Sequence, residues 1–232
     1  VNNLGAARIR IRSLLAAIRV REKLGKHRTI RSSAIEKVPF TEEMRKDYTI
    51  ICPQMSPIHF DLLEPAFRSC GYNFEVLDND NRHSVDIGLK YVNNDACFPS
   101  ITVVGQLMEA VTSGRYDTDH LALMMTQTGG CCRASNYVGF IRRALEKAGY
   151  GHIPVVSVNL NGMEKNEGFT LSKGLIMDAV HALVYGDLFM RCLYHVRPYE
   201  LEKGSAEAIH QKWKEICVDS LVNPKTKWRY AD

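Results

Sequence analysis

Two kinds of apolar pattern alternate along the chain from about residue 41. Short, nearly continuous apolar runs predict buried strands, and apolar residues spaced three or four apart predict one face of a helix. The predicted strands are residues 48–52, 74–77, 121–126 and 153–158. The predicted helices are residues 59–69, 84–92, 100–112, 136–148, 171–196 and 206–221. Gly71 and Gly149 follow two of these helices as stop signals.

Strands separated by helices indicate βαβ units and a mostly parallel sheet. Crossovers between parallel strands are right-handed, so helices are expected on both faces of a doubly wound α/β sheet. The carboxyl ends of the strands then form the edge where such folds bind ligands. The expected organisation is a basic helix and linker over residues 1–40, followed by an α/β lobe over residues 41–232 that ends in further helices.

The first predicted helix, residues 4–24, is amphipathic and basic. Its apolar face is formed by Leu4, Ile11, Leu14, Leu15, Ile18 and Leu24. Between Arg8 and Arg31 the only acid is Glu22, while basic residues are frequent. We favour a solvated amphipathic helix over a nucleic-acid surface. Because the chain begins without methionine and inside a helical pattern, it is expected to be a fragment of a longer protein.

Composition indicates an ordinary globular chain. Of 232 residues, 45% are hydrophobic, and the formal charge is +4 with a mean hydropathy of −0.20. No apolar run approaches the roughly 18 residues of a membrane span, so no membrane partner is expected. Seven cysteines without a recognisable secretory signal favour reduced thiols in the cytoplasm.

Cys97 lies in a polar loop directly before a predicted helix, with Pro99 placed for the first helical turn. Unpaired backbone amides and the helix dipole favour a thiolate at such a position. Thiolates bind metals and iron–sulfur clusters. The alternative is a buried cysteine with a packing role, the usual situation for a lone cysteine.

A second cysteine loop follows the third predicted strand. It contains Gln127, Gly129, Gly130, Cys131, Cys132 and Arg133. The glycines allow a sharp turn close to a bulky ligand, and Arg133 could stabilise a thiolate or an anionic substrate. Adjacent cysteines do not easily bind one iron together, so Cys132, nearer the next helix, is preferred over Cys131. The alternative is a glycine-rich phosphate loop.

Other candidates are less distinctive. Cys52 ends the first strand and is either a third thiol of the site or a packing residue. The amides of Asn94 and Gln127 either hydrogen-bond a cluster or substrate, or close turns. No Cys-x-x-Cys, Walker or Ser-His-Asp pattern is recognisable, and no histidine is paired with an acid at a catalytic spacing.

Long motifs around both cysteine loops resemble the 2-hydroxyacyl-CoA dehydratase superfamily, and more narrowly the acyl-CoA dehydratase activase-related proteins, also called CoA-substrate-specific enzyme activases. The resembling blocks are residues 52–59, 91–100, 103–106, 126–137, 186–191 and 197–199. The resemblance extends over residues 38–221, most of the chain.

The resemblance implies a flavodoxin-like lobe that holds a [4Fe–4S] or double-cubane cluster through cysteines. It also implies an ATP-dependent activase domain or subunit that delivers low-potential electrons, used by the dehydratases for radical removal of water from a 2-hydroxyacyl-CoA. Cys97 matches one ligand motif and Cys132 the other, whereas glycine is common at position 131. Asn94, Gln127, Gly129, Gly130 and Arg133 lie in the same motifs.

A further ligand cysteine and the ATPase domain are not evident in the sequence. We therefore expect one lobe of a multidomain lyase or oxidoreductase, with the cluster completed by another dehydratase-like lobe and with acyl-CoA as a further partner. Two alternatives remain open: a non-catalytic scaffold that docks the activase ATPase domain, and a CoA- or nucleotide-binding domain without a cluster. Nucleic acid is not an expected partner.

Overall fold

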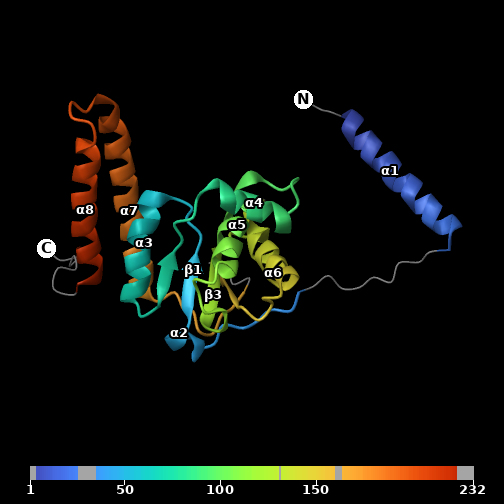
Figure 1. Ribbon diagram of the computed structural model, residues 1–232, viewed down its shortest axis with the longest axis horizontal. Coiled ribbons are helices and arrows are strands. Elements are labelled where there is room, and N and C mark those ends of the chain that lie inside the picture. Colours follow the sequence, from blue (N-terminus) through green and yellow to red (C-terminus); the bar gives the residue numbers. More distant parts are fainter. Residues whose placement is uncertain (1–3, 26–34, 131, 160–163, 224–232) are drawn as a thin grey trace. The chain divides into compact units, whose positions relative to one another are not determined.

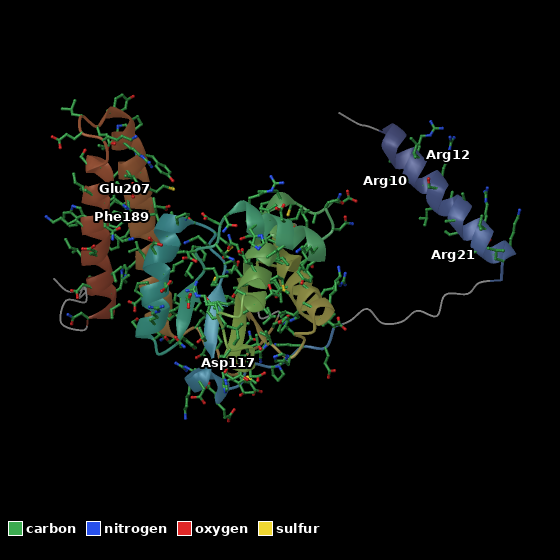
Figure 2. The ribbon with its side chains drawn as sticks, viewed as in Figure 1. Arg10, Arg12, Arg21, Asp117, Phe189 and Glu207 are labelled. Atoms are coloured by element: carbon green, nitrogen blue, oxygen red, sulfur yellow. The ribbon has the colours of Figure 1, made fainter. Side chains whose placement is uncertain are left out.

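The computed structural model describes residues 4–25, 35–130, 132–159 and 164–223 (Figure 1). The chain divides into two compact units, residues 1–34 and 35–232. The first contains helix α1 (Leu4–Lys23), whose large apolar side chains are all exposed, as are the basic side chains of Arg10, Arg12 and Arg21 (Figure 2). The second unit begins at Ile35, six residues before the expected position.

The second unit is built on a four-stranded parallel sheet, which confirms the predicted fold class. Its strands are β1 (Thr49–Cys52), β2 (Phe74–Val76), β3 (Leu121–Thr126) and β4 (Val155–Val158), in the order β2-β1-β3-β4. Ile50 is aligned with Phe74 on one side and Ala122 on the other, and all three are buried. Apolar side chains on both faces are typical of a parallel sheet that is covered on both sides.

Helices cover both faces of the sheet. On one face lie α3 (Pro57–Ser69) and α7 (Lys173–Val196), with α8 (Ser205–Val222) packed against these two helices rather than against the sheet (Figure 1). On the other face lie α4 (Arg82–Tyr91), α5 (Phe98–Thr112) and α6 (Tyr137–Ala148). The doubly wound, flavodoxin-like arrangement is therefore confirmed. A short helix that the sequence did not predict, α2 (Met44–Asp47), precedes β1. Three 3-10 segments complete the described elements: η1 (Thr118–His120), η2 (Arg133–Asn136) and η3 (Arg197–Tyr199).

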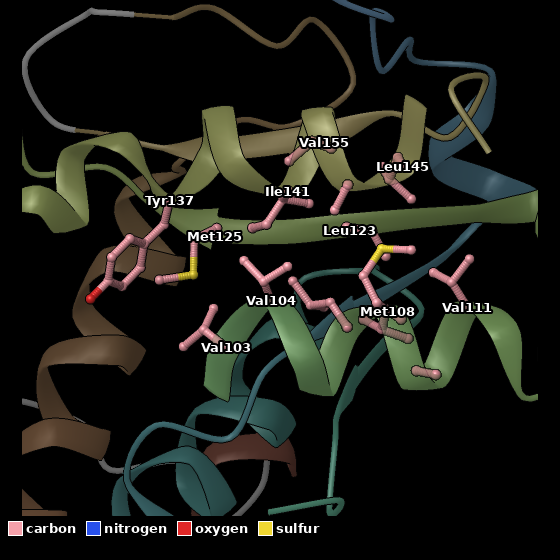
Figure 3. Packing of buried hydrophobic residues seen from close by; sticks show 14 of the residues in the cluster. Val103, Val104, Met108, Val111, Leu123, Met125, Tyr137, Ile141, Leu145 and Val155 are labelled. Carbon is pink, nitrogen blue, oxygen red and sulfur yellow. The ribbon is translucent and has the colours of Figure 1, made fainter. Parts of the chain in front are cut away.

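Helix α5 is the most deeply buried helix among the described elements. Val104, Leu107 and Met108 are fully buried, and Val104 and Met108 point toward β3 and α6 (Figure 3). Because α5 leads toward the first residue of β3 and packs along that strand, its own first residue lies at the carboxyl edge of the sheet. Packing of the core therefore fixes the position of the residue before α5, Cys97.

Two glycines allow α4 and α5 to approach closely. A Cβ atom at Gly105 would overlap the carbonyl oxygen of Ser84, and one at Gly88 would overlap that of Ile101. Backbone thus lies against backbone at this helix pair, without room for a methyl group.

Helices α7 and α8 form a hairpin with an apolar groove between them. The groove has a volume of about 410 Å³, and Trp213 and Phe189 are among its lining residues. Phe189 is labelled in Figure 2. No helix in the described part of the chain is both long enough and apolar enough to cross a membrane.

Candidate functional site

Cys97 is held at the carboxyl edge by a closed loop. The Ala96 amide donates to the Asn93 carbonyl, and the Asp95 amide donates to the Asn93 side chain. Cys97 is then the N-cap residue of α5, and its carbonyl accepts hydrogen bonds from the amide and the hydroxyl of Ser100 at 3.0 and 2.7 Å. This confirms that the cysteine directly precedes a helix.

Tyr137, the first residue of α6, connects the two cysteine loops. Its phenol oxygen lies 3.3 Å from the Cys97 sulfur, and its ring is buried. The pKa of the phenol is raised to about 12, first by burial, then by the hydrogen bond to Cys97 and by the nearby thiolate charges of Cys97 and Cys132. The Cys97 sulfur thus contacts the first residue of the helix that directly follows the Cys132 loop.

The loop before Cys132 is braced by hydrogen bonds. The side-chain amide of Gln127 donates to the Ser135 carbonyl at 3.0 Å, and its oxygen accepts from the Ser157 hydroxyl at 2.7 Å. Gly129 has a φ of 72°, a conformation that favours glycine. Cys132 is exposed, and its sulfur accepts from the Ala134 amide at 3.5 Å. The side chain of Gln127 thus closes the loop.

The remaining predicted residues are placed as follows. Asn94 is exposed in the turn before Cys97, and Gly130 is exposed beside Cys132. Arg133 begins η2, but its side chain lies outside the described part of the structure, as does all of Cys131.

Cys52 does not belong to this site. It is 5% exposed in a core cluster with Phe40 and Phe74, and burial raises the pKa of its thiol to about 12. The packing interpretation of Cys52 is therefore confirmed.

Cys97 and Cys132 supply the correct donor chemistry for an iron–sulfur cluster but only part of a donor set. A cubane cluster takes four thiolates. No group of three or more His, Cys, Asp or Glu side chains suited to a metal ion occurs among the described residues. The two thiols fit a shared cluster better than a metal site closed within these residues.

A second polar cluster was missed by the sequence analysis. His59 is hydrogen-bonded to Ser56 and also to Asp187, which lies 128 residues away on α7. No catalytic spacing in the sequence indicated this pairing. The separation in sequence hid the pairing, although both segments belong to blocks that resemble the dehydratase superfamily.

Comparison with known proteins gives no match: no family model fits the chain, and neither the curated proteins nor the solved structures contain a significant relative. The resemblance to the dehydratase superfamily remains a prediction from the motifs.

Replacing Tyr137 with phenylalanine should reduce the reactivity of Cys97. A neutral phenol that donates to sulfur stabilises the thiolate, and a hydrogen bond contributes about 0.5–1.5 kcal/mol. We expect alkylation of Cys97 by iodoacetamide at neutral pH to slow by about two- to tenfold. The exposed Cys192 on α7 is the internal control, and its rate should not change. Equal rates at Cys97 in both proteins would show that the phenol does not support the thiolate.

Proposed function

We propose that this chain is the iron–sulfur cluster-binding lobe of a dehydratase- or activase-related protein that takes part in ATP-driven, low-potential electron transfer. Cys97 and Cys132 are the proposed ligands, and another lobe completes the cluster. The observation that carries the proposal is the contact of 3.3 Å between the Cys97 sulfur and the phenol of Tyr137, because Tyr137 begins the helix that directly follows the Cys132 loop. The motif resemblance supports it independently.

The surroundings of the thiols suit this role. The Tyr137 phenol is protonated at neutral pH, as any phenol with a pKa of 10 or above is, so it can donate a hydrogen bond to the Cys97 sulfur. Hydrogen bonds to sulfur, together with solvent exposure, set the reduction potential of iron–sulfur clusters. A bound cluster would supply one-electron chemistry, and the exposure of Cys132 leaves the site open toward a partner.

The proposed partners follow from the incomplete donor set. Another dehydratase-like lobe would contribute the missing ligands, and an ATP-dependent activase domain or subunit would supply electrons. An acyl-CoA substrate would belong to the complete assembly. The free cysteines among the described residues support a reducing compartment such as the cytoplasm.

Anaerobic reconstitution tests the proposal. The 232-residue chain is incubated with ferrous iron and sulfide, and bound iron, bound sulfide and the electron paramagnetic resonance spectrum after reduction are measured. Wild type should bind both elements, whereas Cys97→Ala and Cys132→Ala should each lose most of the bound cluster. Cys192→Ala removes an exposed thiol on α7 and should behave as wild type.

Two results would contradict the proposal. One is a wild-type chain that binds neither iron nor sulfide. The other is equal loading of wild type, Cys97→Ala and Cys132→Ala, because iron would then be held elsewhere.

A further inference from the structure

Ser56, His59 and Asp187 form a continuous hydrogen-bonded chain. The Ser56 hydroxyl lies 2.8 Å from His59 Nδ1, and His59 Nε2 lies 2.9 Å from Asp187 Oδ1. Both distances are within the range expected between a nucleophile, a general base and an acid that orients the base. With Asp187 accepting the Nε2 proton, His59 presents an unprotonated Nδ1 to the hydroxyl.

The Ser56 hydroxyl is not used in the usual way for its position. Ser56 is the N-cap residue of α3, where a serine side chain commonly accepts a hydrogen bond from a first-turn amide. It makes no such bond and contacts the imidazole instead. Ser172, the N-cap of α7, shows the ordinary arrangement and accepts from the Leu175 amide at 3.1 Å.

The surrounding structure holds the imidazole in place. An added Cβ atom at Gly186 would overlap ring atom Cδ2 of His59, so α7 can pass this ring only because residue 186 is glycine. His59 is buried, whereas the Asp187 side chain is 75% exposed. The hydrogen bond from His59 to Asp187 therefore connects the protein interior with solvent.

Two glutamines fix the loop that carries Ser56. The Gln54 amide donates to the side-chain oxygen of Gln106 at 2.8 Å, and the Ser56 amide donates to the side-chain oxygen of Gln54 at 3.2 Å. Gln106 is 1% exposed. The loop directly follows β1, which lies between β2 and β3 in the sheet. The crossover from β1 to β2 runs through α3 on one face, and that from β2 to β3 runs through α4 and α5 on the other, so the carboxyl end of β1 lies at the kind of switch point where doubly wound folds bind ligands.

From this geometry we propose that Ser56 is a nucleophile that accepts an acyl group from an activated ester or thioester, with His59 as its base and Asp187 as the group that orients the base. Ser56 Oγ attacks the carbonyl carbon while His59 Nδ1 takes the hydroxyl proton. The C–O or C–S bond breaks, and the leaving alcohol or thiol takes that proton. Water, activated by His59, then hydrolyses the acyl-serine to a carboxylic acid and restores the hydroxyl.

The competing role is purely structural. A serine–histidine–aspartate chain can simply connect α3 with α7, and removal of any member would then lower stability without affecting reactivity. A nucleophilic Ser56 reacts with an electrophile, whereas a purely structural Ser56 does not. This reactivity does not depend on whether Cys97 and Cys132 bind a cluster.

Labelling with a fluorophosphonate probe separates the two roles. The probe phosphonylates an activated serine, and the hydroxyl oxygen displaces fluoride. In the full 232-residue chain, peptide mass spectrometry should locate the label on Ser56, at a rate at least tenfold above that of Ser172. Ser56→Ala should abolish this label, and His59→Gln and Asp187→Asn should slow it at least tenfold. Hydrolysis of p-nitrophenyl acetate should fall in parallel.

Asp187→Asn is the decisive variant because the side chain is exposed and its shape is preserved, so the fold should remain intact. Ser172→Ala is the matched control and should leave the labelling of Ser56 unchanged. Labelling of Ser56 no faster than that of Ser172, or undiminished labelling in a folded Asp187→Asn protein, would overturn the proposal and leave the structural role.

Discussion

Replacing Gly105 with alanine is expected to destabilise the α/β lobe by about 3 kcal/mol or to prevent its folding. The added methyl group would overlap the carbonyl oxygen of Ser84 on α4, and rotation of a side chain cannot relieve a clash with backbone. Overpacking of cores commonly costs about 1–3 kcal/mol, and a backbone clash belongs at the upper end or above. Urea unfolding followed by circular dichroism measures the change in the free energy of unfolding.

Gly139→Ala is the control for Gly105→Ala. Gly139 lies in α6, is exposed, and has open space where the methyl group would be added. Alanine is preferred over glycine inside helices, so this variant should be as stable as wild type or about 0.5–1 kcal/mol more stable. Equal stability of the two variants would contradict the close approach of α4 and α5.

Replacing Glu164 with alanine should destabilise the protein by about 2–3 kcal/mol. The Arg142 guanidinium donates to both carboxylate oxygens of Glu164 at 2.8 and 2.7 Å, and it also donates to the Val155 carbonyl at 3.2 Å. The side chains of Arg142 and Glu164 are only 15% and 19% exposed. Loss of the carboxylate leaves a largely buried charge without its main partner, and thermal or urea unfolding reports the cost.

The same pair makes stability depend on acid pH. Hydrogen bonding to Arg142 is the largest cause of a lowered pKa at Glu164, relative to an ordinary value of 4.5. A carboxyl whose pKa is lower in the folded state stabilises the protein above its unfolded pKa, and this stabilisation is lost as pH falls through the folded pKa. The difference in unfolding free energy between wild type and Glu164→Gln should therefore be constant from neutral pH down to about 5 and shrink below about 4.5.

Glu207→Gln is a suitable reference for the acid experiment because Glu207 is exposed on α8 (Figure 2). This variant removes one exposed carboxylate and leaves the Arg142–Glu164 pair intact. An undiminished difference between wild type and Glu164→Gln at low pH would mean that the carboxylate of Glu164 does not stabilise the fold.

Most of the fold follows from local patterns in the sequence. The strands of a parallel sheet are covered on both faces, so they occur as short apolar runs such as residues 121–126, which is β3 as observed. Pro99 and Gly149 mark the ends of two helices because proline suits a first turn and glycine adopts the positive φ of a C-cap. The same local signals placed Cys97 directly before α5.

What the sequence could not reveal depends on contacts between distant segments. His59 and Asp187 meet only because α3 and α7 pack on the same face of the sheet. The brace from Gln127 to Ser157 depends on the pairing of β3 with β4, and Cys52 is buried because helices cover both faces. The approach of Cys97 to Tyr137 likewise depends on the packing of α5 against α6.

The strand order has a consequence for synthesis on the ribosome. Strand β1 pairs with β2 soon after both have emerged, but its other neighbour, β3, follows only after roughly 70 residues of intervening chain. Until β3 is made, the edge of β1 that later pairs with β3 stays unpaired, and the sheet consists of β1 and β2 alone. Unpaired strand edges and exposed apolar surface make such intermediates prone to aggregation. Translation stalled before Leu121 should therefore give a protease-sensitive, chaperone-dependent product.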